Sequence, residues 1–195
     1  MSYTKNLNRR SCHSRKILCD GFIREDGLYE IEGRMIDTKS HDIPQNNGKM
    51  LMKGDALHDM YVLLVINEKM VIQSAKADTH SAPYEICKNA NFKFDSLNGL
   101  IIGPGWRKKI NSSIGGSNGC THIRELLISM ATVAYQTVYG EKTRLRRIAK
   151  KEGKPDPFPV NSSAPPLLNS CFTFDESSEV TKNLWPKYWI KKRPN

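Results

Sequence analysis

The chain has 195 residues, of which 38% are hydrophobic, and carries a formal net charge of +10 at pH 7. This length allows one domain with a buried core, and no apolar run approaches the roughly 20 residues that cross a bilayer, which argues against a membrane-spanning protein. The five cysteines, together with the lack of a signal-peptide core, favour a cytoplasmic protein with free thiols over a disulfide-rich secreted one.

The first predicted elements are strands of an antiparallel sheet. Asp26-Gly27 is a hairpin signal, and the residues after it alternate, with Tyr29 and Ile31 on one face and Glu30 on the other. Strands are predicted over residues 17–23, 28–36, 61–66 and 70–77. A polar loop is predicted over residues 40–54. The sequence therefore predicts a meander of about four strands.

Helices are predicted in the second half of the chain. Pro83 can begin a short helix, and a second short helix is expected over about 106–112. A long amphipathic helix is predicted over about 121–139, and the basic stretch at 141–154 can extend it. Strands followed by helices indicate an α+β fold in which the sheet packs against helices, one of them long and in the C-terminal half.

Composition divides the chain into four parts. We expect a basic N-terminal tail (1–12), an α+β core domain (13–140), a basic and Pro-rich linker (141–166) and a C-terminal segment (167–195) that packs on the core. The basic clusters are compatible with an anionic small molecule or an acidic protein partner. No nucleic-acid-binding motif accompanies them, so we expect neither a nucleic-acid partner nor a membrane partner.

A glycine-rich stretch leads directly into the long predicted helix and contains Cys120 and His122. Free backbone N–H groups and the positive end of the helix dipole favour a thiolate at Cys120. His122, two residues later, can serve as a base or as a metal ligand. The alternative is a small residue at a helix start followed by a solvated histidine.

Two further segments place reactive side chains next to a structural break. His58 precedes a buried strand, and Cys87 lies in the first predicted helix. If these meet Cys120 and His122 in the fold, two thiolates and two imidazoles suit tetrahedral zinc or an iron–sulfur unit, with Asp59 supporting the ligands. Two alternatives stay open: Cys120 as a nucleophile with His122 or His58 as its base, and His58 as a hydrogen-bonded core histidine.

A group of acidic residues and an aromatic turn are weaker candidates. The acidic residues are Asp26, Glu30, Glu32 and Asp37. Glu30 and Glu32 share a strand face and can hold a cation, although Arg34 on the same face can instead form a salt bridge. Trp106 and Arg107 follow a Gly-Pro-Gly break and can bind an anionic planar ligand or form a rigid turn.

Several short motifs occur together in one order along the chain. They are residues 24–33, Asp37-Thr38-Lys39, His58-Asp59-Met60, Pro83-Tyr84-x-x-Cys87, Gly103-Pro104-Gly105-Trp106 and Gly119-Cys120-Thr121-His122. With these motifs the chain resembles the bacterial domain-of-unknown-function 2889 family over roughly residues 13–190. Phe172 departs from the family pattern, which has histidine there. The resemblance implies a cytoplasmic protein associated with the breakdown of aromatic and steroid-like compounds, without an assigned reaction.

A weaker likeness links the chain to iron–sulfur scaffold proteins, because His58, Cys87 and Cys120 follow the order of their ligands. The resulting hypothesis is an accessory protein of aromatic or steroid-type catabolism. Its metal or iron–sulfur unit would be bound by His58, Cys87, Cys120 and His122. The alternative is an enzyme that uses Cys120, His122 or His58 on an anionic intermediate such as an acyl thioester, with Trp106 and Arg107 binding the ligand.

Overall fold

The computed structural model describes residues 8–45, 48–159, 164–165 and 167–191. Parts of the predicted basic tail (1–7), linker (160–163 and 166) and C-terminal segment (192–195) lie outside the described residues. The chain divides into two compact units, Met1–Arg144 and Leu145–Asn195.

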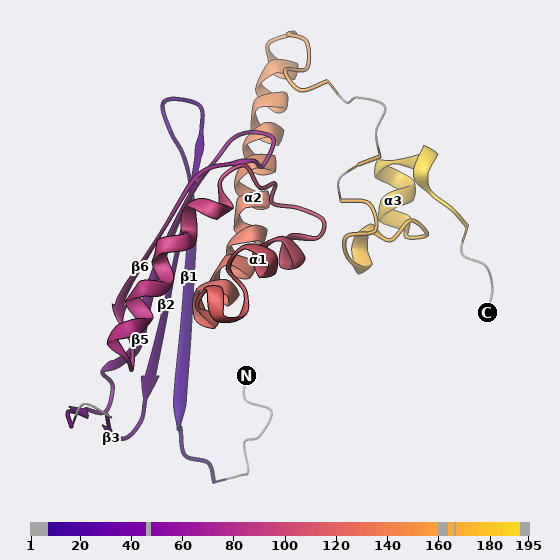
Figure 1. Cartoon of the computed structure of the whole chain (residues 1–195). Helices are drawn as coiled ribbons and strands as arrows, with labels where there is room; N and C mark the ends of the chain where they lie inside the picture. The colour runs from indigo at the N-terminus through magenta and orange to yellow at the C-terminus, as the bar shows by residue number, and fades with distance from the viewer. Residues whose placement is uncertain (1–7, 46–47, 160–163, 166, 192–195) are drawn as a thin grey trace. The chain divides into compact units, whose positions relative to one another are not determined.

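The first unit is built on a four-stranded antiparallel sheet in the order β1-β2-β5-β6 (Figure 1). Its strands are β1 (His13–Ile23), β2 (Tyr29–Lys39), β5 (Ala56–Ile66) and β6 (Ile72–Ser81). Two short strands, β3 (Ile43–Pro44) and β4 (Met50–Leu51), pair with each other in the connection between β2 and β5. The predicted meander of about four strands is confirmed, and each main strand is longer than the sequence pattern indicated.

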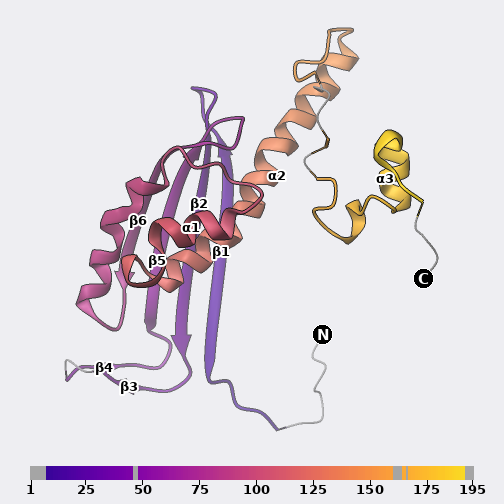
Figure 2. The ribbon, with the colours of Figure 1, turned by 45° about the vertical axis from the view of Figure 1, so that its right-hand side comes forward.

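The helices of the first unit follow the sheet in the chain. They are η1 (Glu85–Leu97), α1 (Trp106–Ile114), η2 (Gly116–Asn118) and α2 (Thr121–Lys151), which extends beyond Arg144, the last residue of this unit. The predicted long helix is confirmed as α2, and the basic stretch after residue 140 continues it to Lys151. In Figure 2, α1 and α2 lie over the same face of the sheet. The structure therefore has the predicted α+β class.

Alternating residues on the sheet and one stripe of α2 form the core. On β2 the side chains of Ile31 and Met35 are fully buried, whereas those of Glu30 and Glu32, on either side of Ile31, are only partly buried. On α2, Leu126 and Met130 are also fully buried. Spacings of two in the strand and of four in the helix place these residues on facing surfaces. One hydrophobic cluster joins buried residues of the sheet, η1, α1 and α2.

The second unit contains η3 (Phe172–Phe174), α3 (Glu179–Leu184) and η4 (Pro186–Tyr188). Ser178 caps α3, because its side chain accepts a hydrogen bond from the Thr181 backbone N–H at 3.0 Å. The rings of Phe174 and Trp185 lie 5.4 Å apart. None of the helices in the described part of the chain has the length and apolar character needed to cross a membrane.

Close packing of α2 on β1 predicts that Gly21 tolerates no side chain. A Cβ atom at this position would lie 2.9 Å from Thr137 Cβ on α2, closer than real Cβ contacts. Gly21→Ala is therefore expected to lower the free energy of unfolding by about 1–3 kcal/mol, measured by urea denaturation. Gly140→Ala is the control, because a Cβ there meets no heavy atom within 4 Å. In the interior of α2 it should stabilise by about 0.5–1 kcal/mol; equal effects of both substitutions would contradict this packing.

Candidate metal centre

Three side chains from separate elements meet where α2 begins beside the sheet. Asp37 on β2, His58 on β5 and His122 in the first turn of α2 each offer one ligand atom, and these atoms lie within 4.8 Å of one another. Asp37 and His58 are direct partners in the β2–β5 ladder, next to an irregularity in register between Asp37 and Thr38. The sheet thus aligns two of the residues, and the start of the helix adds the third.

Asp37 is the most buried charged side chain of this group, with 1% of its surface exposed. Arg15, directly opposite on β1, donates from Nε and Nη2 to the two carboxylate oxygens, each at 2.7 Å. His13 Nε2 lies 3.4 Å from the same carboxylate. Burial alone would raise the pKa of Asp37, but the hydrogen bonds and charge of Arg15 outweigh it, and the pKa lies below its ordinary value. Asp37 is therefore an ionised carboxylate paired with Arg15.

His58 is held by Asp37 in a defined orientation. Its Nδ1 lies 3.0 Å from Asp37 Oδ2, and because an ionised carboxylate can only accept, the proton belongs on Nδ1 and the lone pair on Nε2. Burial lowers the pKa of His58; Asp37 acts in the opposite direction, but the net shift is downward. His58 is thus a neutral imidazole with Nε2 available to a metal or a proton.

His122 links this pair to a thiol. Its ring centroid lies 3.9 Å from that of His58, and its Nδ1 lies 3.7 Å from Cys120 Sγ. Burial lowers the pKa of His122, and the nearby His58 and Arg15 lower it further. Cys120 immediately precedes α2, and its carbonyl accepts a hydrogen bond from the Arg124 backbone N–H at 3.1 Å.

The arrangement offers neutral imidazoles and a thiol at distances that suit a metal ion. In tetrahedral zinc sites, Zn–N bonds of about 2.0–2.1 Å and Zn–S bonds of about 2.3 Å place nitrogen and sulfur ligands about 3.6 Å apart. The distance of 3.7 Å between Cys120 Sγ and His122 Nδ1 is close to that value. Asp37, bonded to the other nitrogen of His58, has the position of the carboxylate that commonly orients a metal-bound histidine.

The structure brings two of the four predicted ligands, His58 and His122, together with Asp37. Cys120 Sγ lies 3.7 Å from His122 Nδ1 but, like Cys87 in η1, is not in the group of described residues whose ligand atoms all lie within 4.8 Å of one another. Asp59 does not support His58: it accepts two hydrogen bonds from Arg34, at 2.7 and 2.9 Å. The carboxylate that contacts His58 is that of Asp37.

The predicted ligand-binding pair on α1 is divided between core and surface. Trp106 is buried and its Nε1 donates to the Leu127 carbonyl at 3.0 Å. This agrees with the structural role that the sequence analysis gave as the alternative to ligand binding. Arg107 is exposed. A ligand-binding role for these two residues stays a prediction.

Sequence reasoning gave no role to three neighbours of the centre: His13, Arg15 and Met60. His13 and Arg15 precede the predicted first strand, but the hairpin centred on Asp26 would have aligned Arg15 with Asp37. Met60 shares a strand face with His58 because it lies two residues later. In the sequence it could not be told from an ordinary core methionine.

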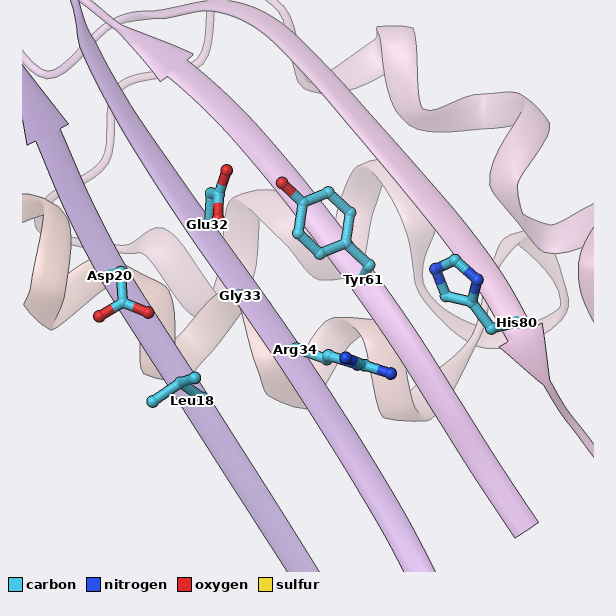
Figure 3. A pocket seen from close by; sticks show the side chains of 7 residues that line it. All are labelled: Leu18, Asp20, Glu32, Gly33, Arg34, Tyr61 and His80. Atoms are coloured by element: carbon cyan, nitrogen blue, oxygen red, sulfur yellow. The ribbon is translucent and has the colours of Figure 1, made fainter. Parts of the chain in front are cut away.

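The other face of the sheet carries a separate pocket of about 330 Å³ (Figure 3). It is lined by Leu18, Asp20, Glu32, Gly33, Arg34, Tyr61 and His80. Burial, followed by the hydrogen bond and charge of Glu32, raises the pKa of Tyr61 to about 12. Of the predicted acidic group, Glu32 lies here, whereas Asp37 lies in the metal centre. Asp26 and Glu30 form salt bridges with Arg24.

Comparison with known proteins gives a family but no function. A family model described as "Protein of unknown function (DUF2889)" matches residues 13–136. This range includes every residue of the candidate metal centre. No curated protein and no solved structure matches the chain.

Proposed function

Because the chain belongs to the DUF2889 family, whose description names no reaction, we propose its function from the site: the protein binds one transition-metal ion through His58, His122 and Cys120. One observation carries this proposal, the convergence of Asp37, His58 and His122 within 4.8 Å, with the Cys120 thiol 3.7 Å from His122 Nδ1. Zinc is the reference ion, since it accepts imidazole and thiolate ligands together.

The surroundings of the three ligands support binding of a cation. Asp37 fixes the His58 ring through Nδ1, which leaves Nε2 as its ligand atom. Arg15 neutralises Asp37, so this pair adds no net charge. The downward pKa shifts of His58 and His122 keep both imidazoles in the neutral form that metals require.

A single ion suits the site better than an iron–sulfur cluster. Such clusters are held mainly by cysteine thiolates, commonly four. The thiol that contacts His122 is Cys120, and neither Cys120 nor Cys87 is in the group of described residues whose ligand atoms lie within 4.8 Å of one another. We place this metal-binding protein in the breakdown of aromatic or steroid-like compounds as an accessory protein; the support for that setting is the resemblance of its motifs to the family.

Zinc titration of two cysteine variants tests the proposal. In untagged full-length protein, Cys120→Ser is expected to lower zinc affinity at least about 100-fold, since even the loss of a supporting residue typically weakens a metal site 10- to 100-fold. Cys87→Ser, which removes another partly buried thiol, is the matched control and should stay within about twofold of wild type. Zinc bound below one ion per chain, or unaffected by Cys120→Ser, would contradict the proposal.

A second candidate function is supported by the same contact. Cys120 lies at the N-terminal end of a long helix with an imidazole nitrogen 3.7 Å from its sulfur, an arrangement that can generate a nucleophilic thiolate. Such a thiolate could attack an acyl thioester, as the sequence suggested. The zinc titration separates metal binding from nucleophilic catalysis. Unchanged zinc affinity in Cys120→Ser would show that the thiol is not a metal ligand and would favour the nucleophilic role.

A further inference from the structure

The metal centre contains a second sulfur atom that the sequence gave no reason to single out. Met60 Sδ lies 3.8 Å from Cys120 Sγ, and only 1% of the Met60 surface is exposed. Met60 lies two residues after His58 on β5, so both side chains point to the face of the sheet on which α2 begins. The start of α2 therefore meets a histidine and a methionine from the same strand.

We propose that the ion this site selects is cuprous copper, with Met60 Sδ as a ligand beside Cys120 and His122. This inference rests on the proposed metal-binding function and adds the identity of the metal. A thioether is not among the usual zinc ligands, whereas thiolate and thioether sulfur together select soft Cu(I). The distances of 3.7 and 3.8 Å from Cys120 Sγ to His122 Nδ1 and Met60 Sδ are those expected between ligands of one ion with bonds of about 2.0–2.3 Å.

Charge balance also favours a monovalent ion. Asp37 and Arg15 neutralise each other, and histidine binds a metal as the neutral imidazole, so a metal-bound Cys120 thiolate is the one charge among the proposed ligands. Cu(I) would make the centre neutral, whereas a divalent ion would leave one positive charge among partly buried side chains. An uncompensated charge away from water is unfavourable.

Competition for Cu(I) against a chromophoric chelator, bicinchoninate, tests the inference in full-length protein kept reduced and free of oxygen. Met60→Leu is expected to lower Cu(I) affinity about 10-fold or more and to change zinc affinity by less than about twofold. The substitution conserves volume and should leave the fold intact. Met130→Leu is the matched control: Met130 is fully buried but lies ten residues beyond Cys120, about 15 Å along α2, and should not affect Cu(I) affinity.

The outcomes separate this inference from the function on which it rests. Loss of Cu(I) affinity in Met60→Leu alone supports a methionine-ligated copper site. An unchanged Cu(I) affinity, an equal loss of zinc affinity, or the same loss in Met130→Leu overturns the inference. In each of these cases the proposed function survives if Cys120→Ser still loses zinc. If wild-type protein binds neither ion, both the inference and the proposed function fall.

Discussion

Asp37→Asn is expected to weaken zinc binding by about 10- to 100-fold, although Asp37 need not touch the ion. The carboxylate holds His58 through Nδ1 at 3.0 Å and is itself held by Arg15. An amide cannot accept from both partners as a carboxylate does, so His58 would lose the interaction that fixes its orientation and tautomer. The measurement is equilibrium zinc affinity of the full-length variant.

The same substitution is expected to lower the free energy of unfolding by about 1–3 kcal/mol, because the buried side chain at position 37 would no longer be an ionised acceptor for Arg15 and His58. Asp59→Asn is the matched control. Asp59 also accepts two hydrogen bonds from an arginine, Arg34, but Arg34 is more than half exposed at 52%. Asp59→Asn should lower the free energy of unfolding by at most about 1 kcal/mol and leave zinc affinity unchanged. Equal zinc affinity in the Asp37 and Asp59 variants would contradict a role of Asp37 in zinc binding.

Acidification is expected to destabilise the metal-free protein from about pH 7 downwards. The pKa values of His58 and His122 lie below their ordinary value of 6.5 in the folded chain, so the unfolded chain takes up these protons first. Their contribution to stability is full above about pH 7 and is lost as the pH falls through the unfolded value of about 6.5 towards the folded pKa values. Asp37, whose pKa is also lowered, adds a loss of the same sign at lower pH.

Urea denaturation in EDTA at about pH 7.5, 5.5 and 4.5 measures this dependence. His122→Gln should reduce the loss of stability between the first two pH values, since it removes one of the two shifted groups. His41→Gln, which removes an exposed histidine, controls for the loss of an imidazole as such. Stability of wild-type protein that rises on acidification through this window would contradict the environment described for His58 and His122.

The sheet and the long helix were predictable because their hydrophobic periods are strong. The alternation around Glu30 and Glu32 and the Asp-Gly turn identify the β1–β2 hairpin. The ends of the strands were missed, since His13 and Arg15 precede the apolar part of β1 and Asp37 follows that of β2. Polar residues at strand ends carry no hydrophobic signal, although the hairpin symmetry implied their pairing.

The sequence predicted some residues of the candidate centre but missed others. The sequence identified His58, Cys120 and His122 from their positions at structural breaks; the structure places His58 near His122 and Cys120 in contact with His122. The contact of Met60 with Cys120 and of Asp37 with His58 could not be predicted locally. It depends on which face of β5 meets the start of α2, and that is decided by packing of the whole core rather than by any local pattern.

X-ray absorption at the zinc edge of the zinc-loaded full-length protein tests the metal centre most directly. The proposed function predicts imidazole nitrogen ligands at about 2.0–2.1 Å and one sulfur ligand at about 2.3 Å, from His58, His122 and Cys120. A spectrum with oxygen ligands alone, lacking both sulfur and imidazole scattering, would contradict the account.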